Sequence, residues 1–276
     1  MTPSALGPLF DVAARAASLM EGGRLPSADH RPWPLPRDPW IMAQTWEELL
    51  FAHWPVPADA VARLIPRKLP LDTFDGSAWV AVTPLIVTGL RGRGLPPVPG
   101  LSTFPEINVR TYVTLGGKPG VFFFSLDAAS ALAVQAARLS YRLPYYRARF
   151  SVEKRGEWIL YANSRSDPGA PPADFSAEYG PIGDPAPARP GTFAWWGTER
   201  YCLYSVDRRG AIYRAEIHHA PWPLRPAEAR IQRNTMTSAA GIKLPDLQPV
   251  VHFARRLDVK VWAPVRVADA EGRGVA

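Results

Sequence analysis

Between Phe104 and Tyr146, four charged residues stand among apolar neighbours in segments that have the patterns of strands and helices. They are Glu106, Arg110, Asp127 and Arg138. A buried charge destabilises a protein unless it is paired. The stretch therefore predicts either a structural ion pair or the floor of a pocket, and it does not name a substrate.

Alternation along residues 106–112 sorts these side chains by face. Successive side chains of a strand point to opposite faces, so Glu106, Asn108, Arg110 and Tyr112 share one face and Ile107 and Val109 share the other. The polar face lines the interior of a barrel that holds a polar ligand, or it faces solvent. Alternation alone leaves both arrangements open.

An interior position would give each residue a chemical role. Arg110 or Arg138 would bind a carboxylate or phosphate through the planar guanidinium. Glu106 would act as a general acid or base if burial raises its pKa. Tyr145 would donate a hydrogen bond to a carbonyl or enolate oxygen. The alternative is a Glu106–Arg138 ion pair that only fixes a helix on the barrel.

Other kinds of site have little support in the sequence. His218 and His219 are adjacent, so on a strand they point to opposite faces and cannot share a metal, and His53 beside Trp54 is interpreted as a packed histidine. No spacing of His, Cys and Asp is typical of zinc, and no phosphate loop or nucleophile elbow occurs. We therefore predict no metal and no cofactor.

Many short strands and few helices are expected in the central part of the chain. A short helix is predicted over 57–66, and Asp127 is predicted to cap a longer helix that ends near Arg142. Irregular segments are expected at 89–100, which could form a flap, and at 167–192. Strands are predicted at 77–87, 106–115, 121–125, 147–154, 157–164, 201–206, 212–218 and 257–261. This pattern indicates an α+β, mainly β fold with a closed or nearly closed antiparallel barrel or sandwich and a few peripheral helices.

The ends of the chain differ in composition from the centre. Residues 1–22 have the apolar spacing of an amphipathic helix, and a proline-rich connector follows to residue 39. The connector could be a dimer contact, although a brace across the main domain is the preferred interpretation. We expect an N-terminal arm over 1–39, a barrel domain over 40–266 and a tail over 267–276.

Composition excludes several classes of protein. Hydrophobic residues make up 47% of the chain, which is ample for a core, and the single cysteine fits a reducing cytosol. The net charge of +7 is spread along the chain rather than gathered in stripes, so nucleic acid is not an expected partner. No apolar run approaches the length of a membrane span, and no signal peptide is recognisable. We expect a cytoplasmic protein with a small-molecule ligand, and a homo-oligomer remains open.

Seven segments together resemble the YqjF-like family of uncharacterised bacterial proteins, which is similar to the acetoacetate decarboxylase fold superfamily. The matching segments are residues 51–57, 71–80, 104–113, 124–127, 143–146, 198–201 and 219–224. The resemblance implies a cone-like barrel around an interior pocket. It covers residues 40–264, and it is specific only as a set of motifs.

The resemblance also implies which chemistry is absent. Decarboxylases of that superfamily use a lysine amine that condenses with a ketone to form a Schiff base. Tyr145 and Tyr146 stand where those enzymes have the lysine pair, and a phenol cannot form that imine. Glu106 matches the carboxylate of the motif and Arg138 the helix arginine. Lys243 is the only lysine with an apolar setting, and an exposed loop lysine is the favoured interpretation.

Three functions remain open at this point. The first is a small-molecule-binding barrel without Schiff-base chemistry, for a small carboxylate or carbonyl ligand that Asn108, Arg110, Tyr112 and Tyr146 would contact. The second is an enzyme that uses Glu106, Arg138 and Tyr145 for acid–base chemistry on an oxo-acid-like substrate. The third is a structural or interaction module whose interior is filled by its own side chains.

Overall fold

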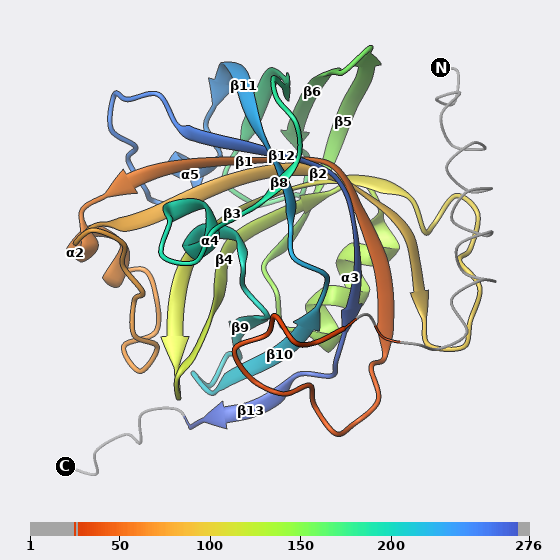
Figure 1. Ribbon diagram of the computed structural model, residues 1–276, viewed down its shortest axis with the longest axis vertical. Coiled ribbons are helices and arrows are strands. Elements are labelled where there is room, and N and C mark those ends of the chain that lie inside the picture. Colours follow the sequence, from red (N-terminus) through yellow and green to blue (C-terminus); the bar gives the residue numbers. More distant parts are fainter. Residues whose placement is uncertain (1–24, 26, 270–276) are drawn as a thin grey trace.

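Thirteen strands form one continuous sheet in the computed structural model, which describes residue 25 and residues 27–269 (Figure 1). The strands are β1 (Met42–Val56), β2 (Ala78–Gly92), β3 (Phe104–Leu115), β4 (Lys118–Ala128), β5 (Tyr145–Arg155), β6 (Trp158–Arg165), β7 (Asp174–Pro181), β8 (Ala186–Pro187), β9 (Cys202–Val206), β10 (Ile212–His218), β11 (Pro223–Asn234), β12 (Val250–Val261) and β13 (Val265–Ala268). The helices are α2 (Ala58–Ala62), α3 (Ala131–Ser140), α4 (Phe193–Thr198) and α5 (Met236–Ala239). The helix expected over 1–22 lies outside the described residues.

Nine strands close into a barrel that we call the packed ring. They pair in the order β1-β2-β3-β4-β5-β6-β7-β11-β12, and β12 pairs with β1 to close the ring. Its interior is filled by apolar side chains from each of the nine strands. Tyr161 and Tyr179 cross this core and donate hydrogen bonds to the backbone oxygens of Glu106 (2.7 Å) and Glu48 (2.9 Å). The interior of the packed ring is therefore a hydrophobic core.

A second closure uses the opposite face of β1–β4, and we call it the cavity ring. β9 pairs with β4, β10 pairs with β9, and β10 reaches β12. Figure 1 shows β9 and β10 at the end of the molecule away from β5 and β6. The β4–β9 contact requires glycine at position 120, because a Cβ there would lie 2.7 Å from both the carbonyl oxygen and the sulfur of Cys202. The sheet β1–β4 is thus a wall shared by two rings.

A bulge at Glu48 lets β1 serve both rings. Glu48 has a positive φ of 51°, and the β1–β2 register shifts there. Before the bulge the even-numbered Trp46 faces the cavity ring, whereas after it the odd-numbered Leu49 does, and Leu50 enters the packed core. The Glu48 carboxylate accepts from Lys154 (2.7 Å) and Arg255 (2.6 Å), which holds the bulge in place.

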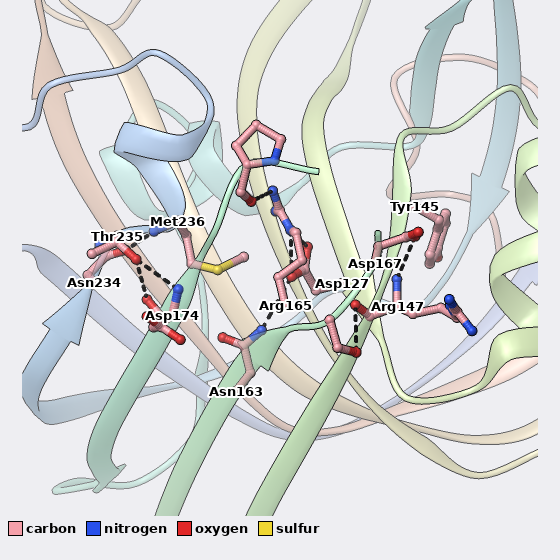
Figure 2. A network of polar contacts seen from close by, with 12 residues as sticks. Asp127, Tyr145, Arg147, Asn163, Arg165, Asp167, Asp174, Asn234, Thr235 and Met236 are labelled. Carbon is pink, nitrogen blue, oxygen red and sulfur yellow. Dashed lines mark hydrogen bonds and ion pairs between the residues drawn. The ribbon is translucent and has the colours of Figure 1, made fainter. Parts of the chain in front are cut away.

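A buried ion pair joins β4 to β6 across β5, and it corrects the sequence prediction for Asp127 (Figure 2). Asp127 does not cap a helix. It lies in β4, fully buried, and accepts from both Nε and Nη2 of Arg165, the shorter contact being 2.7 Å. Ser130 caps α3 instead, because its side chain accepts from the amide of Ala133. The helix therefore begins at Ala131 and ends at Ser140, which is shorter than predicted.

The closed, mainly β architecture with few helices confirms the predicted fold class, and each of the eight expected strands is present, five of them longer than predicted. The sheet is mixed rather than purely antiparallel, because β5 and β9 each run parallel to β4. The prediction of an irregular loop over 167–192 is wrong at 174–181, where β7 pairs with β6 and β11. The prolines and glycines that flank β7 masked its alternating Phe175, Ala177 and Tyr179.

The described part of the N-terminal connector lies against the cavity ring. Arg31 donates to the carboxylate of Glu216 (3.0 Å) and to the backbone oxygen of Ile217 (2.5 Å) on β10. The indole of Trp33 also donates to Glu216 (2.6 Å). These contacts hold this part of the connector against β10, and its role as a brace stays a prediction.

Candidate functional site

A cavity of about 510 Å³ occupies the cavity ring. β1, β2, β3 and β4 form one wall, and α3 with residues 198–203, Ile217 and Trp222 form the other. Leu95 and Val98 line the cavity and are also more than half exposed, so the mouth lies at residues 90–98 beside α3. The third function left open by the sequence was a module whose interior is filled by its own side chains. A cavity of this size is inconsistent with that function.

The polar face of β3 points into the cavity. Arg110, Asn108 and Glu106 follow one another along the wall from the inner end towards the mouth, and Ile107 and Val109 enter the packed core. Tyr112 shares the polar face but lies beyond Arg110, outside the lining. Its hydroxyl is 2.5 Å from Nε2 of His53, which is fully buried.

Glu106 and Tyr145 form a hydrogen-bonded pair midway along the cavity. The Tyr145 hydroxyl donates to Oε2 of Glu106 at 2.8 Å. Burial raises the pKa of Glu106 to about 7, although hydrogen bonds from Tyr145 and Asn108 act against that shift. Burial, with the adjacent carboxylate, also raises the pKa of Tyr145 well above its usual value. The pair therefore supplies a carboxyl group that exchanges its proton near neutral pH and a phenol that stays protonated.

Arg110 is a buried cation with no acidic partner. Its side chain lies over the rings of Phe51 and Tyr112, with the guanidinium carbon 5.1 and 6.0 Å from their centroids. Within the described residues no carboxylate oxygen lies within 4 Å of its guanidinium. Arg200, at the same end of the cavity, is by contrast neutralised by Asp72 at 2.5 Å. The inner end of the cavity is thus left with one uncompensated positive charge.

Several polar atoms of the lining are buried without a hydrogen-bond partner. They are Thr83 Oγ1, Asn108 Oδ1, Arg110 Nε, Arg200 Nη2 and Trp222 Nε1. Buried polar groups are nearly always hydrogen-bonded, because an unmet donor or acceptor costs about 1–3 kcal/mol. Five such atoms around one cavity match a ligand that carries both acceptors and donors.

Arg138 and Tyr146, both predicted from the sequence, lie outside the cavity lining. Arg138 donates to the backbone oxygen of Tyr145 (2.7 Å) and pairs with Asp167, so the Glu106–Arg138 ion pair, offered above as the alternative, does not form. The ring of Tyr146 stacks on the guanidinium of Arg165, 4.1 Å from its carbon. Helix α3 turns Arg138 away from the cavity because its small residues face inward instead.

The sequence analysis did not identify several polar residues of the lining, among them Thr83, Arg200 and His219. Arg200 lies just before β9 and His219 just after β10, in two segments whose sequences show no alternation, and Thr83 looked like an ordinary strand residue. His219 stacks on Tyr201 at 4.7 Å, and burial lowers its pKa to about 4, so it is neutral at physiological pH. His218, on the opposite face as predicted, stacks on His30.

No lysine occurs among the residues that line the cavity. Lys243 is exposed, as the favoured interpretation held, whereas Lys118 pairs with Glu216 at 2.6 Å. Across the described residues no group of three or more His, Cys, Asp and Glu side chains is arranged to hold a metal ion. Among the described helices none is long and apolar enough to span a bilayer.

The raised pKa of Glu106 predicts a pH dependence of stability. Between pH 4.5, the ordinary pKa, and pH 7 the unfolded chain ionises this carboxyl group while the folded chain keeps it protonated. Folding therefore loses about 3 kcal/mol of stability as pH rises through this interval. We expect Glu106→Gln to remove that loss, measured as the difference in free energy of unfolding by urea at pH 5 and pH 8. An unchanged pH dependence in the variant would contradict the assignment.

Comparison with known proteins places the chain in a family. The DUF2071 family model, described as an uncharacterized conserved protein, matches residues 43–258. The uncharacterized protein YqjF of Bacillus subtilis (strain 168) is 48% identical over 227 residues, which cover 82% of this chain and 92% of that protein.

Solved structures share the architecture at low sequence identity. The enduracididine biosynthesis enzyme MppR complexed with pyruvate is 13% identical with a TM-score of 0.57, over 88% of this chain and 95% of that one. The acetoacetate decarboxylase of Legionella pneumophila subsp. pneumophila str. Philadelphia 1 is 12% identical with a TM-score of 0.58, over 87% of this chain and 94% of that one. The chain belongs to the DUF2071 family and has the acetoacetate decarboxylase-like fold that the sequence resemblance implied.

Proposed function

We propose that this protein binds a small carboxylate or carbonyl compound in the cavity and does so without a Schiff base. The observation that carries the proposal is Arg110, a buried cation without an acidic partner at the inner end of a mainly apolar cavity. A ligand carboxylate would supply the missing charge through a charge-assisted hydrogen bond. Asn108 and Thr83, whose buried oxygens lack partners, would bind a second polar atom.

The fold neighbours support a small acid as ligand. MppR, which shares this architecture, was solved in complex with pyruvate. A keto acid combines a carboxylate for Arg110 with a carbonyl oxygen for the hydroxyl of Tyr145 or for protonated Glu106. The predicted role of Tyr145 as a hydrogen-bond donor is retained in this proposal, and Arg138 is left as a residue that positions the backbone of Tyr145.

The charge of Arg110 gives the first test. We expect at least one member of a panel of small carboxylates, which includes pyruvate, acetoacetate and butyrate, to bind the wild type, and Arg110→Met to weaken that binding by about tenfold to hundredfold. Calorimetric titration measures the dissociation constants. The ligand-free variant should also be more stable than the wild type, because it no longer buries an unpaired cation.

Arg149→Met is the matched control, because Arg149 is exposed on β5 and its loss changes the net charge equally. If both variants weaken carboxylate binding equally, the effect comes from the long-range charge of the protein and not from a contact with Arg110. No binding of any carboxylate by the wild type would refute the proposal itself.

The absence of lysine from the lining is the argument against an imine. An imine needs a neutral amine beside the bound carbonyl, and Tyr145 supplies a phenol at the position where related decarboxylases are expected to have that amine. The cavity would therefore bind a carbonyl ligand without forming an imine with it.

Reductive trapping tests this separation. Treatment of the wild type with borohydride and either pyruvate or acetoacetate should leave its intact mass unchanged. The variant Tyr145→Lys, which places an amine in the cavity, should gain the mass of one reduced adduct. A stable adduct on any lysine of the wild type would show that imine chemistry is retained.

Acid–base catalysis is the second candidate function, and the Glu106–Tyr145 pair favours it. A carboxyl group with a pKa of about 7 is matched to proton transfer at neutral pH. A phenol that stays protonated would stabilise the oxygen of an enolate formed from an oxo acid. Glu106 would remove a proton from the carbon next to the carbonyl, and Tyr145 would donate its hydrogen bond to the enolate oxygen.

Proton exchange distinguishes catalysis from binding alone. If the second candidate holds, the wild type exchanges the C3 protons of 2-oxo acids with deuterated water at a rate that rises through pH 7, as seen by NMR. Glu106→Gln should then lower that rate by about a hundredfold or more. Equal rates for the two proteins would leave only the binding function.

A further inference from the structure

The shape of the cavity bears on the size of the ligand as well as on its charge. Arg110 at the inner end and Phe104 near the mouth are six positions apart, which corresponds to about 20 Å along a strand. Both residues line the same cavity of about 510 Å³. An acid as small as acetate bound at Arg110 would leave most of that length empty.

The outer part of the cavity is largely apolar, and Arg91 is the charged residue that residues 90–98 add to its lining. Residues 90–98 contribute Leu90, Leu95 and Val98, and β3 contributes Phe104. Further in, Phe123 and Leu126 of β4 lie beside Arg110 and Asn108. Apolar surface of this kind is stabilised when a ligand displaces water from it.

Helix α3 is built to leave this part of the cavity open. Its lining residues are Ala133, Ala136, Ala137 and Ser140, which recur at the spacing of one helical face. Larger residues of the same helix, Leu132 and Leu139, are directed to solvent and are 63% and 80% exposed. The face that could have closed the outer cavity with leucine side chains carries small residues instead.

We infer that the ligand is an amphiphilic acid: a carboxylate for Arg110 carried on an apolar chain that runs past Glu106 to the mouth between α3 and residues 90–98. This inference rests on the proposed function, since it takes the carboxylate site at Arg110 as given. It adds that the chain of the ligand supplies much of the affinity. A protonated Glu106, hydrogen-bonded to Tyr145, is compatible with an apolar chain beside it because the group is then uncharged.

A homologous series of straight-chain carboxylates from acetate to dodecanoate provides the test. Binding is followed by the fluorescence of Trp46 and Trp222, which line the cavity, and by calorimetry. We expect the affinity of the wild type to rise about fourfold for each added methylene until the chain reaches the mouth. In Arg110→Met every member should bind more weakly by the same factor.

Variants of α3 locate the chain. Ala137→Leu fills the outer cavity, so the rise in affinity should stop at a shorter acid while butyrate binds as it does to the wild type. Ala136→Leu, at a more exposed position, serves the same purpose if Ala137→Leu does not fold. Gln135→Leu adds the same side chain to the exposed face of α3 outside the lining, and its affinities should match those of the wild type.

The outcomes separate the inference from the proposed function. If short acids bind in an Arg110-dependent way and chain length has no effect, the amphiphilic ligand is refuted and the carboxylate site stands. The amphiphilic ligand is also refuted if long acids bind equally to the wild type and to both α3 lining variants. If no acid of the series binds, both the site and the inference fall.

Discussion

The constraint on which this structure depends is that one sheet, β1–β4, must serve two rings at once. Successive side chains of a strand point to opposite faces, so each of these strands must satisfy two different environments with a single alternating sequence. In β3 the odd-numbered Ile107 and Val109 meet a packed core, whereas the even-numbered Glu106, Asn108 and Arg110 meet a cavity. A shift of one residue would bury the charged side chains in the packed ring.

Two buried carboxylates keep the shared wall in register. Glu48 fixes the bulge through its ion pairs with Lys154 and Arg255. Without that bulge, the even-numbered side chains would face the cavity ring along the whole of β1. Asp127 of β4 pairs with Arg165 of β6, and β5, which runs parallel to β4, lies between these two strands. Breaking a buried pair costs about 3–5 kcal/mol because it strands the other charge. Both pairs thus act on the geometry of the wall rather than on chemistry in the cavity.

Much of the shared wall β1–β4 could be predicted from the sequence, but the strands, helix and side chains that pack against it could not. Alternation identified β3 and its polar face, because that signal lies within one strand. The assignment of Asp127 failed because aspartate and serine both cap helices well. Asp127 is held in a strand by its pairing with Ile107 of β3 and Tyr146 of β5, which its local sequence does not show. Arg138 was misplaced for a similar reason. The rotation of α3 is decided by which residues face the cavity, and that depends on contacts distant in sequence.

Glu106 and Arg110 line one buried cavity without forming an ion pair, and the protonation state of Glu106 sets the charge of that cavity. Arg200 is neutralised by Asp72 and His219 is uncharged, so the net charge of the inner wall depends on Arg110 and Glu106. While Glu106 is protonated that wall carries one positive charge, which complements a single carboxylate. Once Glu106 ionises, the wall is neutral overall and a bound anion faces a second carboxylate nearby. Desolvation of Glu106 therefore links the protonation state of this residue to the charge of the ligand that the cavity can hold.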